Sequence, residues 1–298
     1  WGAQDDDESL KALHKAIDLG VNFIDTAAGY GNGHSERIIA KVLKERGEEI
    51  AVATKTPPAE GPWPPSPYCK WSDRYSEKYL RENIEERLRC LDTEALDLLQ
   101  LHTWTRAWNR DPQPFLILQK LKQEGKVKSV GVSTPEQDQN SVIDLMKAGL
   151  VDSVQVIYNI FEQEPAAELL PVAQECNVGI IVRVAFDEGS LTGKFTPDHR
   201  FGEGDFRANY FAGDRLERSI RRVDAIKKDI DGSGLTLPQF ALKYVLAHPA
   251  VSCVIPGMRS VRQAELNCAV SDLPDVEETY LRKMRDHRWN RGVWYSGK

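Results

Sequence analysis

Four ionisable side chains stand at or just after the ends of apolar runs in the first third of the chain. The stretch NFIDTAAGYGNGHSE, residues 22–36, carries Asp25 and Tyr30, the run IAVATK ends in Lys55, and the run LDLLQLH ends in His102. Brought together, these residues supply a carboxylate, a phenol, an ammonium and an imidazole. Such a set is suited to general acid–base chemistry, because its members can be tuned by their surroundings to hold or move a proton near neutral pH.

Tyr30 is the candidate proton donor of this set. A free phenol titrates near pH ~10 and gives up its proton poorly at neutrality. An ammonium at ~4 Å, in a medium of effective dielectric ~20, stabilises a phenolate by about 4 kcal/mol and so makes the phenol a much stronger acid. We therefore expect Lys55 to lie beside Tyr30 and Asp25 to keep Lys55 charged and in place. His102 would then hydrogen-bond to a substrate oxygen and orient it.

Each of these residues also has an ordinary structural explanation. An Asp at a strand end often caps the next turn, a Tyr in a glycine-rich loop often packs, and a Lys at a strand end is commonly solvated. A histidine taken alone is more often structural than catalytic. The functional interpretation is favoured because all four residue types are expected on one rim, although structural networks also contain such groups.

Short apolar runs alternate with amphipathic stretches along the chain. The runs predict seven strands over residues 22–27, 50–55, 96–102, 127–133, 153–158, 178–184 and 251–257. Helical patterns lie between them and after residue 215, and several end at Gly or Asn, which accept the left-handed conformation at a helix end. No linker divides the chain, so we expect one domain over residues 1–298. Apolar strands separated by helices predict an α/β fold with a parallel sheet covered on both sides.

A closed (β/α)8 TIM barrel is favoured over a doubly wound sheet. No GxGxxG motif follows the first run, which weakens a Rossmann fold. A barrel needs eight strands, so we expect the first strand, with any N-terminal hairpin, upstream of Trp1. A chain starting at Trp1 would then be an N-terminally incomplete barrel, poorly stable because of its two exposed edges. Polar residues recur at or just past the ends of runs, as on the rim that carries barrel active sites; they are Asp25, Lys55, His102, Ser133, Gln155, Arg183 and Arg259.

Composition excludes several classes of protein. The net charge is -6, and the densest basic stretch, residues 215–222, lies on a helical pattern, so no nucleic-acid partner is expected. No apolar run approaches the ~18 residues that cross a bilayer, so no membrane partner is expected either. The five cysteines are scattered without metal-binding spacing, which predicts free thiols, a cytoplasmic protein and no metal. The sequence leaves open whether the protein is a monomer or a homo-oligomer.

The motifs follow one another in an order that resembles a known family. The segments NFIDTAAGYGNGHSE, ATK, LLQLH, GVS, VQVIYN, GSLTGKF and IPGMRSVRQAELN extend to about Asn267 and are similar to the aldo-keto reductase superfamily. The resemblance implies a (β/α)8 barrel that reduces aldehydes and ketones with NADPH and without metal. It also implies a catalytic tetrad of Asp25, Tyr30, Lys55 and His102, in which Tyr30 protonates the carbonyl oxygen while the cofactor delivers hydride.

The same resemblance implies the cofactor contacts. Ser133 and Gln155 match residues that bind the nicotinamide carboxamide, but Thr134 stands where the family commonly has Asn. Arg183 stands where many members have a Tyr that stacks on the nicotinamide, and a cation there predicts a preference for the reduced cofactor. Arg259 suits a 2′-phosphate at a helix start near Ser260, which predicts NADP(H) over NAD(H). The other implied contacts are Phe186, Gly189, Leu191 and Lys194, with Gly193, in a pyrophosphate loop, Ile255 and Gly257 before the helix, and Gln263 and Asn267 on it.

Aromatic residues predict where a substrate binds. Trp63 follows Lys55, Trp104 follows His102, and Trp1 looks like the family's pocket residue at the end of the first strand. Tryptophans in loops over a barrel mouth are expected to contact substrate, here a small carbonyl compound, sugars included. The proline-rich segment 56–68 would be either a stiff lid over the mouth or a strap packed on the barrel side.

Two other functions stay open from the sequence. Some relatives of this fold are regulatory subunits that bind the cofactor tightly and turn over slowly. An unrelated barrel lyase or isomerase would instead use Lys55 as a Schiff-base amine. The complete tetrad favours the carbonyl reductase.

Overall fold

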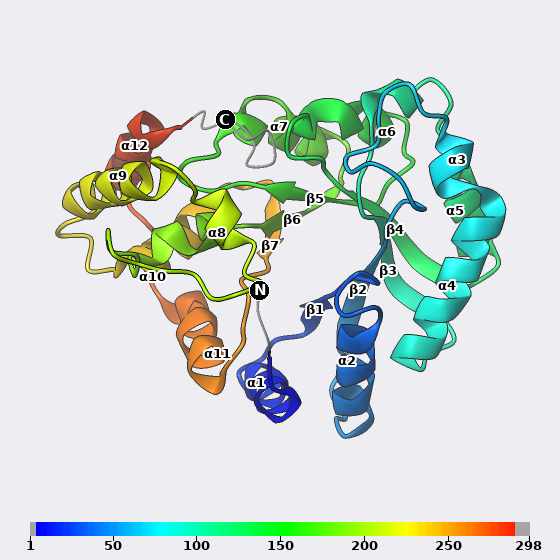
Figure 1. Cartoon of the computed structure of the whole chain (residues 1–298), viewed down its shortest axis with the longest axis horizontal. Helices are drawn as coiled ribbons and strands as arrows, with labels where there is room; N and C mark the ends of the chain where they lie inside the picture. The colour runs from blue at the N-terminus through cyan, green and yellow to red at the C-terminus, as the bar shows by residue number, and fades with distance from the viewer. Residues whose placement is uncertain (1–3, 290–298) are drawn as a thin grey trace.

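Seven parallel strands form one curled sheet in the computed structural model, which describes residues 4–289. The strands lie side by side in chain order, from β1 at one end of the curl to β7 at the other (Figure 1). They are β1 (Phe23–Asp25), β2 (Ala51–Thr56), β3 (Leu96–Leu101), β4 (Val127–Ser133), β5 (Ser153–Ile157), β6 (Gly179–Arg183) and β7 (Val251–Val254). All seven predicted runs are therefore strands of a parallel sheet.

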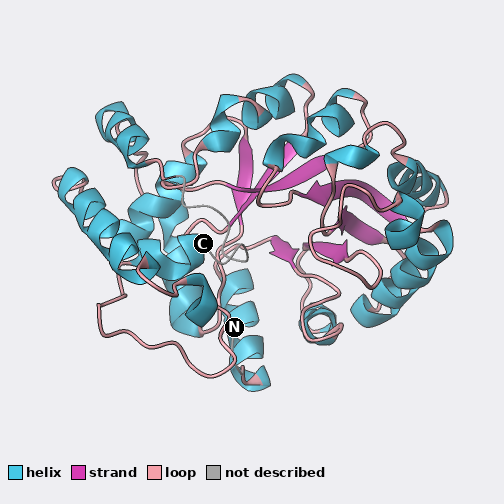
Figure 2. Cartoon of the chain, turned by 45° about the horizontal axis from the view of Figure 1, so that its top comes forward, coloured by secondary structure: helices cyan, strands magenta, loops and turns pink. Residues whose placement is uncertain are grey.

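Helices lie on the outer side of the curl and connect the strands (Figure 2). Within residues 4–289, none of them is long and apolar enough to span a bilayer. Each predicted helical pattern contains a helix, whereas the short α3 and α8 are not expected from the sequence. The helices are α1 (Asp6–Asp18), α2 (His34–Lys44), α3 (Trp71–Tyr75), α4 (Glu77–Leu91), α5 (Gln113–Gln123), α6 (Ile143–Lys147), α7 (Leu169–Glu175), α8 (Arg207–Tyr210), α9 (Arg215–Asp229), α10 (Leu237–Leu246), α11 (Val261–Cys268) and α12 (Glu278–Met284).

Among residues 4–289, six short 3-10 helices complete the connections. They are η1 (Arg106–Trp108), η2 (Gln139–Val142), η3 (Glu164–Ala167), η4 (Asp187–Thr192), η5 (Ala269–Asp272) and η6 (Arg285–His287). Of these, η4 lies in the predicted pyrophosphate loop after β6, where the backbone carries the left-handed residues described below.

Among the described residues, buried apolar side chains form two clusters, one on each face of the sheet. The large cluster fills the space between the sheet and the outer helices, with fully buried residues such as Leu99, Val130 and Phe115. The small cluster consists of Ala53, Leu98 and Ile181 with partly buried neighbours that include Ile255. Because successive side chains of a strand point to opposite faces, the sheet supplies both clusters, as a barrel sheet must.

The sheet has two unpaired ends among the described residues. There β1 pairs with β2 and β7 pairs with β6, and no pairing joins β1 to β7 within residues 4–289. An eighth strand between them would close the barrel. The predicted strand upstream of Trp1 lies outside the described residues and stays a prediction.

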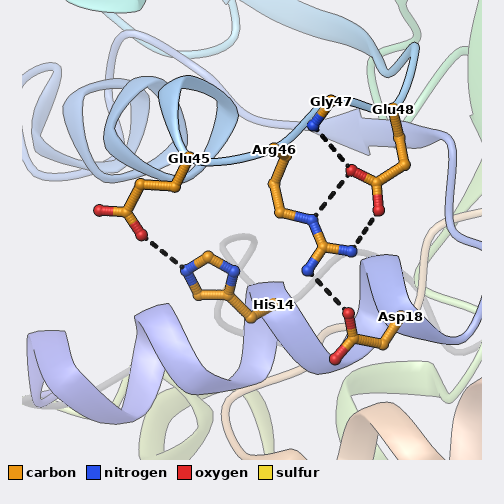
Figure 3. A network of polar contacts seen from close by, with 6 residues as sticks. All are labelled: His14, Asp18, Glu45, Arg46, Gly47 and Glu48. Atoms are coloured by element: carbon orange, nitrogen blue, oxygen red, sulfur yellow. Dashed lines mark hydrogen bonds and ion pairs between the residues drawn. The ribbon is translucent and has the colours of Figure 1, made fainter.

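An exposed polar network joins α1 to the segment that leads into β2 (Figure 3). Arg46 donates to Asp18 at 2.7 Å and also pairs with Glu48, while His14 lies 3.3 Å from Glu45. The hydrogen bonds from Arg46 lower the pKa of Glu48 below its usual value. Exposed ion pairs of this kind are individually weak, so we interpret the network as orienting α1 rather than as a main source of stability.

Candidate active site

A cavity of about 160 Å³ lies at the C-terminal ends of the strands. Ser133 of β4, Gln155 of β5 and Arg183 of β6 line it directly. The loops after β1 to β4 supply the rest of its lining, namely Tyr30, Trp63, Pro64, His102, Thr103, Thr134, Pro135, Glu136 and Gln137. The structure therefore brings predicted residues from separate strands to one cavity at the rim of the sheet.

Lys55 and Asp25 form a buried ion pair beside this cavity. Lys55 Nζ lies 2.5 Å from Asp25 Oδ2 and donates a second hydrogen bond to the Thr26 carbonyl at 2.8 Å. The two side chains are 1% and 8% exposed. A buried ammonium is strongly unfavourable without a counter-ion, and Asp25 supplies that counter-ion here.

Tyr30 and His102 lie next to the ion pair. Lys55 Nζ is 5.4 Å from the centroid of the Tyr30 ring, and the rings of Tyr30 and His102 meet edge to face at 6.2 Å. Tyr30 is 45% exposed, so a substrate can reach it from the cavity. A nearby ammonium favours negative charge on the phenol, which is the electrostatic condition expected for a tyrosine that releases a proton.

His102 is neutral at physiological pH. Burial, followed by the positive charges of Lys55 and Arg183, lowers the pKa of His102 from 6.5 to about 3. A neutral imidazole can orient an oxygen through a hydrogen bond, but it has no second ring proton to release at pH 7. A neutral His102 at this place can form a hydrogen bond with an atom in the cavity.

Two buried glutamines hold the other oxygen of Asp25. Gln155 donates to Asp25 Oδ1 at 2.7 Å, and Gln100 donates to the same oxygen at 3.4 Å. Gln100 has no exposed surface and stands opposite Lys55 in the register of β2 and β3. Sequence reasoning missed Gln100, although an amide inside the apolar run LDLLQLH is the signal that could have identified it.

Thr134 and Arg183 differ in how they face the cavity. The Thr134 hydroxyl lies 3.1 Å from Gln139 Oε1 and 3.2 Å from the Gln155 carbonyl oxygen, so it is used to hold the loop after β4. Arg183 donates through Nη2 to the Thr134 carbonyl at 3.1 Å. Within residues 4–289, Arg183 Nε is buried without a hydrogen-bond partner. A buried donor in this state fits a ligand acceptor that enters the cavity.

The backbone after β6 adopts unusual conformations from Val184 into the predicted pyrophosphate loop. Val184, Asp187 and Glu188 have positive φ angles of 57°, 47° and 55°, which are uncommon for residues with a β-carbon. Gly189 and Gly193 follow with φ of 100° and 71°. Residues held in such conformations cluster at functional sites, because the surrounding structure must stabilise them.

Four predicted cofactor contacts, three in this loop and one after β7, differ in how exposed their side chains are. Leu191 is fully buried in the large core, so only its backbone can face a ligand, and Phe186 packs partly against the same core. Lys194 is exposed. Ile255, after β7, packs on the small cluster inside the curl. Of these four predicted contacts, Lys194 is therefore the one with a freely accessible side chain.

The segment after β7 leads into α11 through a turn held by side chains. The helix begins at Val261, next to Ser260 as predicted, and Ser260 Oγ caps it by accepting from the Gln263 backbone N–H at 3.3 Å. Gln263 Oε1 accepts from the Arg259 backbone N–H at 2.6 Å, and Asn267 donates to the Gly257 carbonyl at 3.4 Å. Gln263 and Asn267, two of the predicted cofactor contacts, thus shape the turn that contains Arg259.

Arg259 is held at the junction of this turn with the start of α1. Its Nε donates to Gln4 Oε1 at 2.7 Å, and its carbonyl accepts from Gln4 Nε2 at 3.0 Å. Arg259 thus stands two residues before α11, and its guanidinium contacts Gln4, which precedes α1.

The structure describes two of the three tryptophans predicted to contact substrate, and their surroundings differ. Trp63 lines the cavity, is 53% exposed, and meets the His102 ring edge to face at 5.5 Å. Trp104 is only 1% exposed, donates to Asn109 at 2.7 Å and packs on Trp108. The structure thus corrects the prediction for Trp104, because its ring fills the core instead of lining the cavity. Trp1 lies outside the described residues.

Comparison with known proteins agrees with this arrangement. The model of the Aldo/keto reductase family matches residues 1–286. The uncharacterized oxidoreductase YqkF of Bacillus subtilis is 27% identical over 282 residues, which cover 94% of this chain and 87% of that protein. The NADH-specific methylglyoxal reductase of Escherichia coli is 26% identical over 297 residues, covering 93% of this chain and 87% of that protein.

A solved structure gives the same result for the fold. The glycerol dehydrogenase AKR11B4 of Gluconobacter oxydans superposes with a TM-score of 0.77 at 28% identity, covering 96% of this chain and 86% of that chain. The family match spans the Asp25, Tyr30, Lys55 and His102 cluster as well as the segments after β4, β6 and β7. The chain therefore belongs to the aldo/keto reductase family, whose members are oxidoreductases that reduce carbonyl compounds with a nicotinamide cofactor.

Proposed function

We propose that this protein reduces an aldehyde or ketone to the alcohol with NADPH, and that Tyr30 is the general acid. The observation that carries the proposal is the position of Tyr30, which reaches the cavity while its ring lies 5.4 Å from a buried ammonium. Lys55 owes its charge to Asp25, and Asp25 is held in turn by Gln155 and Gln100.

In the proposed reaction, the substrate carbonyl oxygen lies between Tyr30 and His102. Neutral His102 donates a hydrogen bond that orients this oxygen, and Tyr30 releases its hydroxyl proton to the oxygen as negative charge develops there. Lys55 stabilises the phenolate that remains. When bound, a nicotinamide cofactor supplies the hydride that reduces the carbonyl carbon.

The residues around the cavity fit such a cofactor. Ser133 and Gln155 would hold the carboxamide, and the buried, unpartnered Nε of Arg183 offers a donor on the same side. We keep the hypothesis that Arg183, a fixed cation, favours the reduced form of the nicotinamide. Arg259 would hold a 2′-phosphate at the start of α11, which favours NADPH over NADH.

A relative with the opposite preference makes the choice of cofactor a point to test, since the methylglyoxal reductase of Escherichia coli is named NADH-specific. The five cysteines are free thiols in the structure, which is compatible with the proposed cytoplasmic location. A small carbonyl compound is the proposed substrate.

The decisive experiment follows the loss of NADPH or NADH absorbance with a panel of aldehydes, ketones and sugars, for the unaltered protein and for Tyr30→Phe. We expect oxidation of NADPH in preference to NADH, and a loss of turnover on the order of 100-fold or more in the variant because the general acid is gone. Full activity of Tyr30→Phe would refute Tyr30 as the acid. Equal use of the two cofactors would refute the role of Arg259.

A further inference from the structure

The segment between β2 and α3, residues 57–70, carries Trp63 to the cavity and is anchored at both of its ends. Near its start, the Pro57 carbonyl accepts from the Tyr79 hydroxyl at 2.9 Å. Near its end, the Cys69 carbonyl accepts from the Trp108 indole at 2.9 Å. We call residues 57–70 the cavity-wall segment. Anchors of this kind are expected of a fixed wall rather than of a lid that opens and closes.

Arg74 supplies the anchor in the middle of the cavity-wall segment. It is 4% exposed, and it donates through Nε to the Ala59 carbonyl at 2.8 Å and through Nη1 to the Pro62 carbonyl at 3.0 Å. The Ala59 backbone N–H donates in return to the Arg74 carbonyl at 2.8 Å. Within residues 4–289, Arg74 makes no ion pair with a carboxylate. A buried guanidinium is unfavourable unless its N–H groups form hydrogen bonds. Here Arg74 donates these bonds to backbone carbonyls of the cavity-wall segment.

Gly61 shows how closely the cavity-wall segment wraps around this side chain. A β-carbon at Gly61 would lie 2.9 Å from Arg74 Nη1, and the residue has a φ of 147° that favours glycine. Pro62 and Trp63 follow at once in the chain. Fixing the Pro62 carbonyl therefore fixes the peptide plane that joins Pro62 to Trp63, and with it the backbone from which the indole extends.

We propose that Arg74 is a positioning residue that fixes Trp63 as one wall of the substrate site, and that the substrate presents a flat apolar group to this indole. The indole is half exposed and its ring lies 5.5 Å from that of His102, the residue that orients the substrate oxygen in the proposed function. A ring bonded to the carbonyl carbon would lie beside that oxygen and so against Trp63. The substrate half of the inference rests on the proposed function, whereas the anchoring half does not.

Hydrogen exchange followed by mass spectrometry tests the anchoring half without any substrate. Arg74→Met removes the guanidinium, Arg74→Lys keeps the charge but has no fork, and Arg81→Met on α4 removes an exposed arginine that pairs with Glu124. We expect exchange in residues 59–68 to become at least about tenfold faster in both Arg74 variants, with β3 unchanged. Exchange within about twofold of the unaltered protein, or the same acceleration in Arg81→Met, would overturn the anchor.

Steady-state kinetics with benzaldehyde and acetaldehyde test the substrate half. In Arg74→Lys we expect the KM for benzaldehyde to rise about fivefold with kcat within about twofold, and the KM for acetaldehyde to stay unchanged. Trp63→Ala should give the same pattern, and the double variant should add nothing to it. An equal KM change for both aldehydes would overturn the substrate half. If the unaltered protein reduced neither aldehyde nor any other carbonyl compound, the proposed function and this half would fall together, while the exchange data would still decide the anchor.

Discussion

Two buried ion pairs flank β2 on opposite faces. Lys55 of the strand forms one of them, and its neighbour Thr54 hydrogen-bonds to the other. Lys55 points into the curl of the sheet and pairs with Asp25. Its neighbour Thr54 points outward, where its hydroxyl donates to Glu36 Oε1 at 2.5 Å. Glu36 Oε2 lies 2.8 Å from Arg87 Nη1, and both of these side chains are at most 1% exposed. The two pairs thus have the same chemistry and similar burial, but only one is placed beside the cavity.

Their surroundings differ, and for this reason we propose a catalytic role for only one of the two pairs. Glu36 on α2 and Arg87 on α4 meet behind the sheet, and burial raises the pKa of Glu36 even though Thr54 and Arg87 act to lower it. Asp25 and Lys55 instead adjoin Tyr30 and His102, which face the cavity. A buried ion pair therefore does not identify an active site by itself. The proposal of an active site rests instead on Tyr30, which lies beside the pair and lines the cavity.

The largest expected effect comes from breaking the pair beside the cavity. Lys55→Met should lower kcat/KM about 1,000-fold, because Tyr30 loses the charge that stabilises its phenolate. The protein should still fold, since Asp25 keeps its hydrogen bonds from Gln155 and Gln100. Lys243→Met is the matched control, because Lys243 is a buried lysine paired with Asp275 away from the cavity. Loss of less than about tenfold in Lys55→Met, or an equal loss in the control, would contradict the role of Lys55.

Breaking the pair behind the sheet should affect stability instead of turnover. Arg87→Met leaves Glu36 buried without its cation and should lower the free energy of unfolding by about 3 kcal/mol, while kcat of the folded protein stays unchanged. Urea unfolding measures this loss, and Arg46→Met in the exposed network of Figure 3 is the control that should change stability far less. A large fall in kcat of folded Arg87→Met would show that the two pairs are coupled.

The same variant should respond to pH in a defined direction. Because the pKa of Glu36 is raised in the folded state, the folded protein holds a proton there that the unfolded chain releases. The raised pKa of Glu36 therefore contributes to the free energy of unfolding at low pH. This contribution is lost as the pH rises through the pKa that Glu36 has in the folded state. Without Arg87 the folded pKa rises further, so Arg87→Met should be more destabilised, relative to the unaltered protein, at pH 8 than at pH 5. An equal difference at the two pH values would mean that Glu36 does not titrate in this range.

The smallest expected effect concerns His102 on the cavity side. Its pKa is lowered to about 3 in the folded state. Between pH ~6.5 and ~3, His102 is therefore protonated in the unfolded chain but not in the folded protein. His102→Gln removes this source of acid destabilisation. The stability of the variant relative to the unaltered protein should improve on the order of 1–2 kcal/mol between pH 7 and pH 4.5, measured by urea unfolding. His14→Gln in the exposed network should not reproduce this gain; if it does, burial of His102 is not the cause.

Much of the fold could be predicted from the sequence, because strands and long helices are marked by patterns among neighbouring residues. Each of the seven strands appears as an apolar run, and the long helices appear as amphipathic stretches that end in known signals. The short α3 and α8 escaped prediction because they have four or five residues, too few for a helical period to be visible. The eighth strand of a closed barrel stays a prediction.

The candidate site was predictable only in part, because burial depends on distant neighbours. Asp25, Tyr30, Lys55 and His102 are marked by their positions at or just after run ends, and the structure brings them together. Trp104 has the same local setting as Trp63, yet it is in the core while Trp63 lines the cavity. Leu191 likewise turns into the core. No local pattern distinguishes such residues, since the choice depends on which elements pack on them.

The sequence by itself determined which residue types stand at the ends of the strands, because strand period and apolar pattern are properties of neighbouring residues. Tertiary structure alone decided what those residues can do. Lys55 meets Asp25 across 30 positions, and Gln155 reaches the same carboxylate across 130. Arg74 became an anchor for Trp63 only because the chain between β2 and α3 folds back on it. The physical reason is that charge, burial and hydrogen bonding are set by neighbours in space, which only the folded chain supplies.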